Sequence, residues 1–378
     1  MASTYSADLA FLKKHTKIVE LGVGKARVAV APDYQGRVMT STVGGAKAGS
    51  YGWINAKFIR SGAVGTAFDN YGGEDRFWLG PEGGQFALWF AAGELFDMDH
   101  WKTPAGFNSG KFKLASRTKQ AVTLTARFDA ANYSGTRFRC AVRRTVRMLV
   151  AADAAELLGV EVPKGVGMAG FASVNTLTNA SKTAWTHDGG LLSVWILGQY
   201  VPMDKCRVIA PFNPGDDASL GVKVTTDYFG PLPARRGRIG GDHVLFAADG
   251  RYRSKIGVSP VRAKPVIGSY DPDASLLTIV QFNLPSGAAR LPYVNSLWKM
   301  QDAPFAGDAI NSYNDGEAVP GAGQLGPFYE LETSSPAAEL GPGRSITHVH
   351  RTFHFVGEPE LLNILSRAVL GVDLGAIS

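Results

Sequence analysis

The stretch Gly326–Phe355, GPFYELETSSPAAELGPGRSITHVHRTFHF, carries the clearest structural pattern in the chain. Its last nine residues, THVHRTFHF, alternate strictly, which is typical of a β-strand because successive side chains point to opposite faces of a sheet. The segment 328–333 predicts a second strand, on which Glu330 and Glu332 share one face. The link 334–344 is rich in Pro and Gly and therefore predicts a turn.

The two predicted strands carry groups that move protons or hold metals. His348, His350 and His354 share one face of the later strand. Carboxylates and imidazoles on neighbouring strands can form an acid/base site, and the same groups are common metal ligands. Two hypotheses stay open. In one, Glu332 and a histidine share a pocket; in the other, a divalent metal is bound by Glu330, His348 and His350. No other cofactor is expected.

Three features of this stretch point to a known family. They are Leu331-Glu332-Thr333, the segment Leu340-Gly341-Pro342-Gly343, and a strand that begins Thr347-His348. Together they resemble the C-terminal block of the galactose mutarotase (aldose 1-epimerase) superfamily, although Arg344 stands where that block has a second Glu. The whole chain is most similar to an uncharacterised bacterial group with a mutarotase-like domain, whose members carry blocks like those at 72–84, 191–198 and 311–316.

The resemblance implies a fold, an activity and residue roles. The fold would be all-β, a large antiparallel β-supersandwich in a single domain over residues 1–378. The activity would be acid/base chemistry at C1 of an aldose, with Glu332 as the general base. An imidazole from His348, His350 or His187 would protonate the ring oxygen, although the residues around His187 do not match the family's motif.

The rest of the chain independently favours an all-β protein. The 45 Gly and 20 Pro residues suit many short strands joined by tight turns. The apolar run 191–200, LLSVWILGQY, predicts a strand that is buried on both faces. Only 6–15 and 358–370 predict helices, one near each end. The segment 311–316, NSYNDG, predicts a polar turn.

Polar and aromatic residues also gather in 70–85. Arg76 offers a fork of donors for sugar hydroxyls or a carboxylate, and Trp78 offers a plate for the C–H face of a pyranose ring. A scaffold ion pair for Arg76 and a core position for Trp78 are the structural alternatives. The remaining candidate sugar-binding residues, each with its own structural alternative as a turn, core or solvent-facing residue, are Asn70, Glu82, His100, Trp101, Asn175, Asn314 and Glu330.

Three functions remain open on this reasoning. The first is an aldose 1-epimerase that uses Glu332. The second keeps the fold but cleaves glycosidic bonds, either as a hydrolase with Glu82 and Glu332 facing each other across a cleft or as a polysaccharide lyase. The third is a non-catalytic carbohydrate-binding protein. In each case the expected partner is a mono- or oligosaccharide.

Charge and hydropathy argue against other partners. The net charge is +6, but the basic residues are scattered, so no nucleic-acid partner is expected. No apolar run is long enough to span a bilayer. Cys140 and Cys206 are isolated, which predicts neither a disulfide framework nor a zinc site. The first fifteen residues lack a signal-peptide pattern, so a cytoplasmic protein and an exported or periplasmic one without its signal both stay open.

Overall fold

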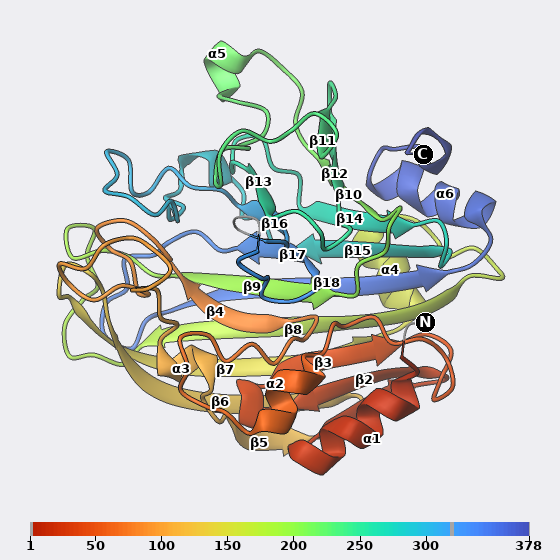
Figure 1. Ribbon diagram of the computed structural model, residues 1–378, viewed down its shortest axis with the longest axis horizontal. Helices are drawn as coiled ribbons and strands as arrows, with labels where there is room; N and C mark the ends of the chain where they lie inside the picture. Colours follow the sequence, from red (N-terminus) through yellow and green to blue (C-terminus); the bar gives the residue numbers. More distant parts are fainter. Residues whose placement is uncertain (1–2, 318–320, 378) are drawn as a thin grey trace.

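Antiparallel β-sheets make up most of the molecule (Figure 1). The computed structural model describes residues 3–317 and 321–377. The largest sheet has ten strands in the order β11-β12-β10-β14-β15-β18-β8-β7-β6-β5. Their bounds are β5 Lys113–Arg117, β6 Ala121–Ala131, β7 Arg137–Leu149, β8 Gly167–Asn179, β10 Arg207–Pro211, β11 Gly237–Ile239, β12 His243–Ala247, β14 Val266–Asp271, β15 Leu276–Phe282 and β18 Ser345–Val356.

A five-stranded sheet packs against the ten-stranded one, and a three-stranded sheet lies beside it. The five-stranded sheet has the order β13-β16-β17-β9-β4 and the smaller sheet the order β1-β2-β3. Their bounds are β4 Arg76–Gly80, β9 Ser193–Tyr200, β13 Ser254–Val258, β16 Ile310–Asn314, β17 Tyr329–Ser334, β1 Val19–Val23, β2 Ala26–Ala31 and β3 Arg37–Thr42. The prediction of a large all-β antiparallel sandwich is therefore confirmed.

The core lies between the two larger sheets. Phe77 on β4 and Ile196 on β9 belong to one buried cluster with Val142 on β7, Phe171 on β8 and other inward-facing residues. The run 191–200 is buried on both faces, as predicted, because the cleft side of β9 is also covered. Burial of this apolar area stabilises the fold by about 25 cal/mol per Å² removed from water.

Helices are short and lie around the sheets. They are α1 Tyr5–His15, α2 Ala56–Ser61, α3 Ala105–Asn108, α4 Ala151–Leu158, α5 Asp217–Leu220 and α6 Pro359–Val369, with 3₁₀ turns η1 Pro32–Tyr34, η2 Ala288–Arg290 and η3 Leu374–Ala376. Leu362 and Leu365 of α6 join Phe353 and Phe355 of β18 in a second buried cluster, so α6 covers the outer face of the ten-stranded sheet. In the part of the chain that the structure describes, no helix is both long and apolar enough to cross a membrane.

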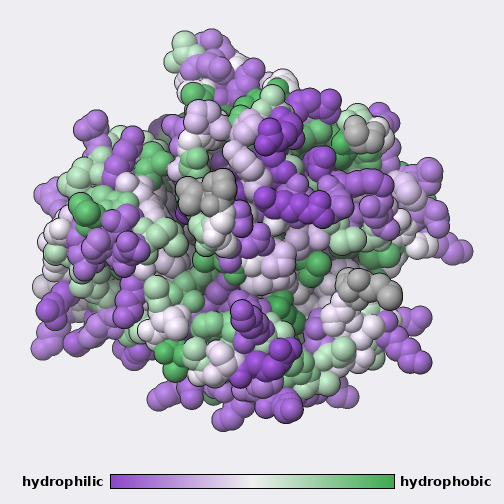
Figure 2. Space-filling view, in the orientation of Figure 1, coloured by the Kyte–Doolittle hydropathy of each residue, from purple (hydrophilic) through white to green (hydrophobic). Residues whose placement is uncertain are grey.

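The face of the molecule seen in Figure 1 carries both hydrophilic and hydrophobic residues. Figure 2 shows hydrophilic residues around most of the margin of this face, with hydrophobic residues scattered among them. Phe229, Met98 and Leu325 are large apolar residues that stay exposed, and all three line the cleft described below.

The two C-terminal strands lie where the pattern predicted them but in different sheets. β17 pairs with β9 and β16, whereas β18 pairs with β8 and β15. The predicted turn at 311–316 is wrong, because 310–314 forms β16, an interior strand of the five-stranded sheet. Its polar side chains find buried partners instead of solvent: Asn314 accepts a hydrogen bond from the Gly250 N–H and donates to the Tyr252 carbonyl.

Candidate functional site

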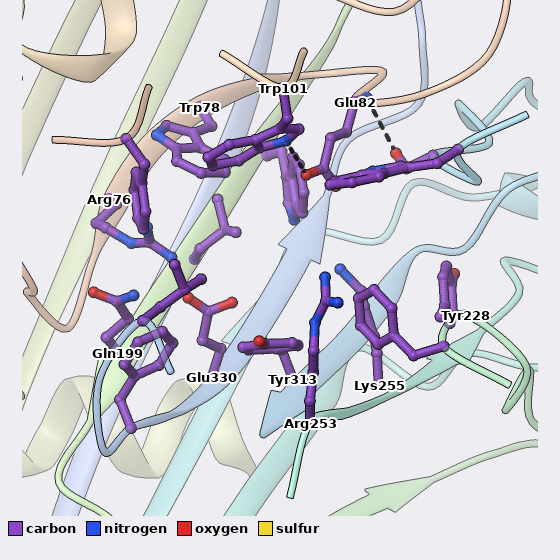
Figure 3. A pocket seen from close by; sticks show the side chains of 18 of the residues that line it. Arg76, Trp78, Glu82, Trp101, Gln199, Tyr228, Arg253, Lys255, Tyr313 and Glu330 are labelled. Carbon is purple, nitrogen blue, oxygen red and sulfur yellow. Dashed lines mark hydrogen bonds and ion pairs between the residues drawn. The ribbon is translucent and has the colours of Figure 1, made fainter. Parts of the chain in front are cut away.

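A cleft with a cavity of about 190 Å³ opens over one face of the five-stranded sheet. On β17, Thr333 faces the ten-stranded sheet, so Glu330 and Glu332 face the other way, toward the side of the cleft. Figure 3 shows Glu330 on the cleft floor. Alternate residues of the neighbouring strands complete this floor. They are Arg76 and Trp78 of β4, Trp195, Leu197 and Gln199 of β9, Tyr313 of β16 and Lys255 of β13.

Indole rings cover much of the cleft surface. Trp78 and Trp195 lie side by side on adjacent strands, with ring centroids 5.6 Å apart. Trp101 and Trp298 come from loops and are roughly parallel, with centroids 6.3 Å apart. The Trp78 Nε1–H is buried and has no hydrogen-bond partner among the described residues. Flat apolar surfaces beside unused donors are what a ligand with both C–H and hydroxyl faces requires.

Arg76 and Glu330 form a buried ion pair on the floor. The Arg76 guanidinium also lies 4.8 Å from the Trp78 ring centroid. Burial raises the pKa of Glu330 to about 8, with Glu332 adding to the rise and Arg76 opposing it. Nε and Nη1 of Arg76 find no partner in the described parts of the chain. A buried donor without a partner costs about 1–3 kcal/mol, so a ligand that accepts these hydrogen bonds gains affinity.

Glu332 lies directly beneath the cavity surface. Its Oε2 accepts hydrogen bonds from Trp195 Nε1 at 2.9 Å and Lys255 Nζ at 3.1 Å, and both donors belong to side chains that line the cleft. Its Oε1 is buried and has no partner among the described residues. Burial lowers the pKa of Lys255, but three carboxylates raise it above its ordinary value, in the order Glu332, Glu82 and Glu330. Lys255 therefore stays an ammonium ion.

Glu82 stands on the opposite wall, in the loop after β4 (Figure 3). Trp101 Nε1–H donates to its Oε1 at 2.8 Å, and burial raises its pKa. The adjoining glycine has a packing role, since a Cβ on Gly83 would lie 2.4 Å from the carbonyl oxygen of Leu297. The glycine-rich block thus lets this wall lie directly against the loop that carries Trp298.

His348 and His350 lie on the far side of the five-stranded sheet from the cleft. Thr333 Oγ1 lies 2.8 Å from His348 Nε2 and 2.9 Å from His350 Nδ1. Burial lowers the pKa of His348 to about 3 and that of His350 to about 4, so both imidazoles are neutral. They do not share a pocket with Glu332, because the alternation of β17 sends residues 332 and 333 to opposite faces.

The same geometry rules out the expected metal triplet. Glu330 faces the cleft, whereas His348 and His350 face the ten-stranded sheet, so the three cannot ligate one ion. Within 3–317 and 321–377, no three His, Cys, Asp or Glu side chains come together in a way that could hold a metal. His354, on the same face of β18, accepts or donates a hydrogen bond with Glu74 at 2.7 Å and is also fully buried.

Two of the predicted imidazoles lie on outer loops. The His187 side chain is 63% exposed and sits beside Asp188 and the Phe305 ring. His100 is also partly exposed and lies 2.6 Å from Asp97. Neither of them lines the cleft. The expectation that His187 protonates a ring oxygen beside Glu332 therefore does not match its position.

Three predicted asparagines have structural partners instead of cleft positions. Asn175 on β8 is bound by the Arg144 guanidinium, which also pairs with Asp75 between the sheets. Asn70 donates to the Leu325 carbonyl, and Asn314 lies in the network around residues 249–252. Of the predicted site residues, Arg76, Trp78, Glu82, Trp101 and Glu330 do line the cleft, and Glu332 adjoins it.

Several cleft residues carry no motif in the sequence. Gln199 is fully buried, and neither atom of its amide has a partner among the described residues. Lys255, Arg253, Tyr228 and Tyr313 also line the cleft. The sequence gives no local signal for them, since β9 is a largely apolar run and β16 a largely polar one, and neither pattern indicates which face lines a cleft.

The fold places this protein in a known structural class. The structure is a galactose mutarotase-like β-supersandwich, and the resemblance found in the sequence is confirmed at this level. A putative aldose 1-epimerase from Escherichia coli K12 shares 11% identity and a TM-score of 0.50, with 89% of this chain and 98% of that chain covered. The Slr1438 protein from Synechocystis sp. PCC 6803 shares 12% identity and a TM-score of 0.51, with 91% and 96% covered. At such identities the similarity concerns the fold.

The family follows from the sequence itself. A family model described as a family of unknown function (DUF6786) matches residues 3–378, and the chain belongs to that family. A comparison with curated proteins found no match.

Proposed function

We propose that this protein binds a mono- or oligosaccharide in the cleft and carries out acid/base chemistry at its anomeric carbon, with Glu332 as the base. One observation carries the proposal. Buried hydrogen-bonding groups without partners among the described residues, on Arg76 and Gln199, lie among indole rings on one concave surface, and Glu332, which also has such a group, adjoins it. Sugars present hydroxyl groups and C–H faces together, and such a surface complements both.

The reaction that fits best is ring opening and closure of an aldose. Oε1 of Glu332 takes the proton of the anomeric hydroxyl as the bond between C1 and the ring oxygen breaks. The ring oxygen receives a proton from a general acid, and the aldehyde forms. Rotation about the C1–C2 bond and reversal of both proton transfers then produce the other anomer. A positioned base or acid of this kind contributes about 10²–10⁴-fold in rate.

Glu82 is the best-placed general acid. The histidines expected in this role lie on the other side of the sheet or on outer loops. Glu82 lines the cleft, and burial raises its pKa above the ordinary value, which is the direction that a general acid needs. The Lys255 ammonium lies 3.1 Å from Glu332 Oε2 and forms an ion pair with the proposed base.

Cleavage of a glycosidic bond is the second candidate. The observation that favours it is the presence of two carboxylates, Glu82 and Glu332, close enough to the same ammonium ion of Lys255 for both to raise its pKa. Glycoside hydrolases usually use two carboxyl groups, one protonated and one ionised. The two reactions differ in their products and so can be separated by experiment.

Proton NMR on a panel of free aldoses and oligosaccharides tests the proposal. Faster exchange between anomers supports the epimerase, and new reducing ends support the hydrolase. Glu332→Gln should lower either activity by at least about 10²-fold while sugar binding persists. Glu156→Gln, at an exposed position on α4, is the matched control and should leave activity unchanged. Binding without turnover identifies a non-catalytic sugar-binding protein, and neither binding nor turnover refutes the carbohydrate assignment.

A further inference from the structure

Three cationic side chains line the cleft, and they differ in how their charge is balanced. Arg76 pairs with Glu330, and Lys255 pairs with Glu332. Arg253 immediately precedes β13. Its guanidinium forms no hydrogen bond and no ion pair with any residue in 3–317 or 321–377. Of the three, Arg253 is therefore the one whose charge is left for a ligand.

The residues packed around Arg253 do not neutralise its charge. Its guanidinium lies 4.0 Å from the centroid of the Phe229 ring, which supports the cation without neutralising it. Figure 3 shows the side chain rising into the cleft between Tyr313 and Lys255. The acidic group that its charge affects is Asp315. That carboxylate is already bound, since it accepts hydrogen bonds from the Tyr313 hydroxyl at 2.6 Å and from the Gly326 N–H at 2.8 Å.

The charge of the cleft as a whole also favours an anion. Arg76 and Lys255 each lie against a carboxyl group, Glu330 and Glu332, whereas Arg253 has no such partner among the described residues. Burial raises the pKa of Glu82 and that of Glu330, so both carboxyl groups hold a proton more readily than exposed ones and the charge balance of the cleft shifts toward positive. Aromatic walls exclude water and strengthen any charge pairing inside. A guanidinium presents a planar set of donors that matches a carboxylate, sulfate or phosphate group.

We propose that the saccharide held in this cleft bears an anionic substituent, and that Arg253 binds it. The shared chemistry is a group of oxygens with negative charge, supplied by the carboxylate of a uronic acid or by a sulfate or phosphate ester. This inference rests on the proposed function, because it names the class of sugar that the same cleft takes. It adds a specificity-determining residue that has no place in the acid/base steps.

Matched pairs of neutral and acidic sugars test the inference. The probes are D-glucose, D-glucuronate, D-glucose 6-sulfate and D-glucose 6-phosphate, with D-galactose and D-galacturonate as a second series. Four tryptophans line the cleft, so tryptophan fluorescence reports binding. An acidic probe should bind about ten- to a hundred-fold more tightly than its neutral counterpart, the range for one charge-assisted hydrogen bond. The acidic probe whose affinity rises most over that of its neutral counterpart shows whether the cleft prefers a carboxylate, a sulfate or a phosphate.

Substitutions at Arg253 and Arg251 test whether the preference for acidic sugars depends on Arg253. Arg253→Gln should abolish the preference for the acidic probe, and Arg253→Lys should retain most of it. Arg251→Gln removes the same charge two residues away, from an exposed side chain that pairs with Asp204 outside the cleft, and should change nothing. Arg253 is half-buried and has no structural ion pair, so these variants should fold, which thermal unfolding checks.

The outcomes separate this inference from the proposed function. Equal affinity for neutral and acidic sugars, or a preference for the neutral ones, overturns the anionic inference and leaves sugar binding intact. A preference for acidic sugars that survives Arg253→Gln overturns the role of Arg253. Failure of every sugar to bind overturns the proposed function and this inference with it.

Discussion

Acid should destabilise the protein through the two histidines buried between its sheets. His348 and His350 are fully buried and share the hydroxyl of Thr333. Their pKa values are lowered from 6.5 to about 3 and about 4, mainly by burial. The unfolded chain therefore binds protons near pH 6 that the folded protein does not bind. Their contribution to stability is complete above pH 6.5 and is lost as the pH falls below it.

The size of the effect follows from the same values. Between pH 7 and pH 5, an unfolded histidine takes up most of one proton, whereas each of the two buried ones stays almost fully neutral. Each should lower the free energy of unfolding by about 2 kcal/mol over this interval, so the pair accounts for about 4 kcal/mol. That is a large part of the about 5–15 kcal/mol by which a domain is usually stable.

Urea unfolding at the two pH values measures this contribution. His348→Gln and His350→Asn each keep a polar atom near the nitrogen that faces Thr333 but cannot take up a proton. The double variant should lose about 4 kcal/mol less than the unsubstituted protein between pH 7 and pH 5. His187→Gln removes an imidazole from an exposed loop and is the control. If the double variant keeps the full pH dependence of the unsubstituted protein, the buried neutral imidazoles are not its source.

Three further predictions concern stability. Thr333→Val removes the hydroxyl shared by two buried imidazoles and should cost about 1–3 kcal/mol in urea unfolding, whereas Thr333→Ser should cost much less. Arg144→Met leaves the carboxylate of Asp75 buried without its partner and should lower the free energy of unfolding by about 3–5 kcal/mol; a loss below 1 kcal/mol would contradict the assigned ion pair. Gly307→Ala would place a Cβ 1.9 Å from the Val294 carbonyl oxygen and should cost at least about 1–3 kcal/mol, measured by thermal unfolding.

The sequence predicts where strands lie along the chain better than it predicts which strands pair with each other. The alternation in 347–355 correctly indicated β18 and placed its histidines on one face. It did not indicate that this face meets Thr333 across the interior, because a period of two residues identifies faces but not sheets. Alternation alone therefore predicts imidazoles in the same pocket as Glu332, whereas the five-stranded sheet separates His348 and His350 from the cleft.

Polar segments were the other source of error. The run Asn311–Gly316 predicts a turn, yet 310–314 is an interior strand whose amides and hydroxyls bond to residues of other segments. Lys255 belongs to the cleft only because β13 pairs with β16 and brings it beside Glu332. The Asn314–Gly250 and Lys255–Glu332 bonds join residues 64 and 77 positions apart, so no local pattern reveals them.

The sequence by itself determined that the chain is a large antiparallel β-sandwich, since alternation, turn residues and the mutarotase-like C-terminal block all depend on local order. It also identified Arg76, Trp78, Glu82, Trp101 and Glu330, which do meet in the cleft. Only the tertiary structure decided that β17 and β18 belong to different sheets, that His348 and His350 lie away from the cleft, and that the Arg253 guanidinium forms no ion pair with any residue in 3–317 or 321–377. Strand pairing and side-chain contacts between distant segments decide all three, because they depend on how the whole chain packs.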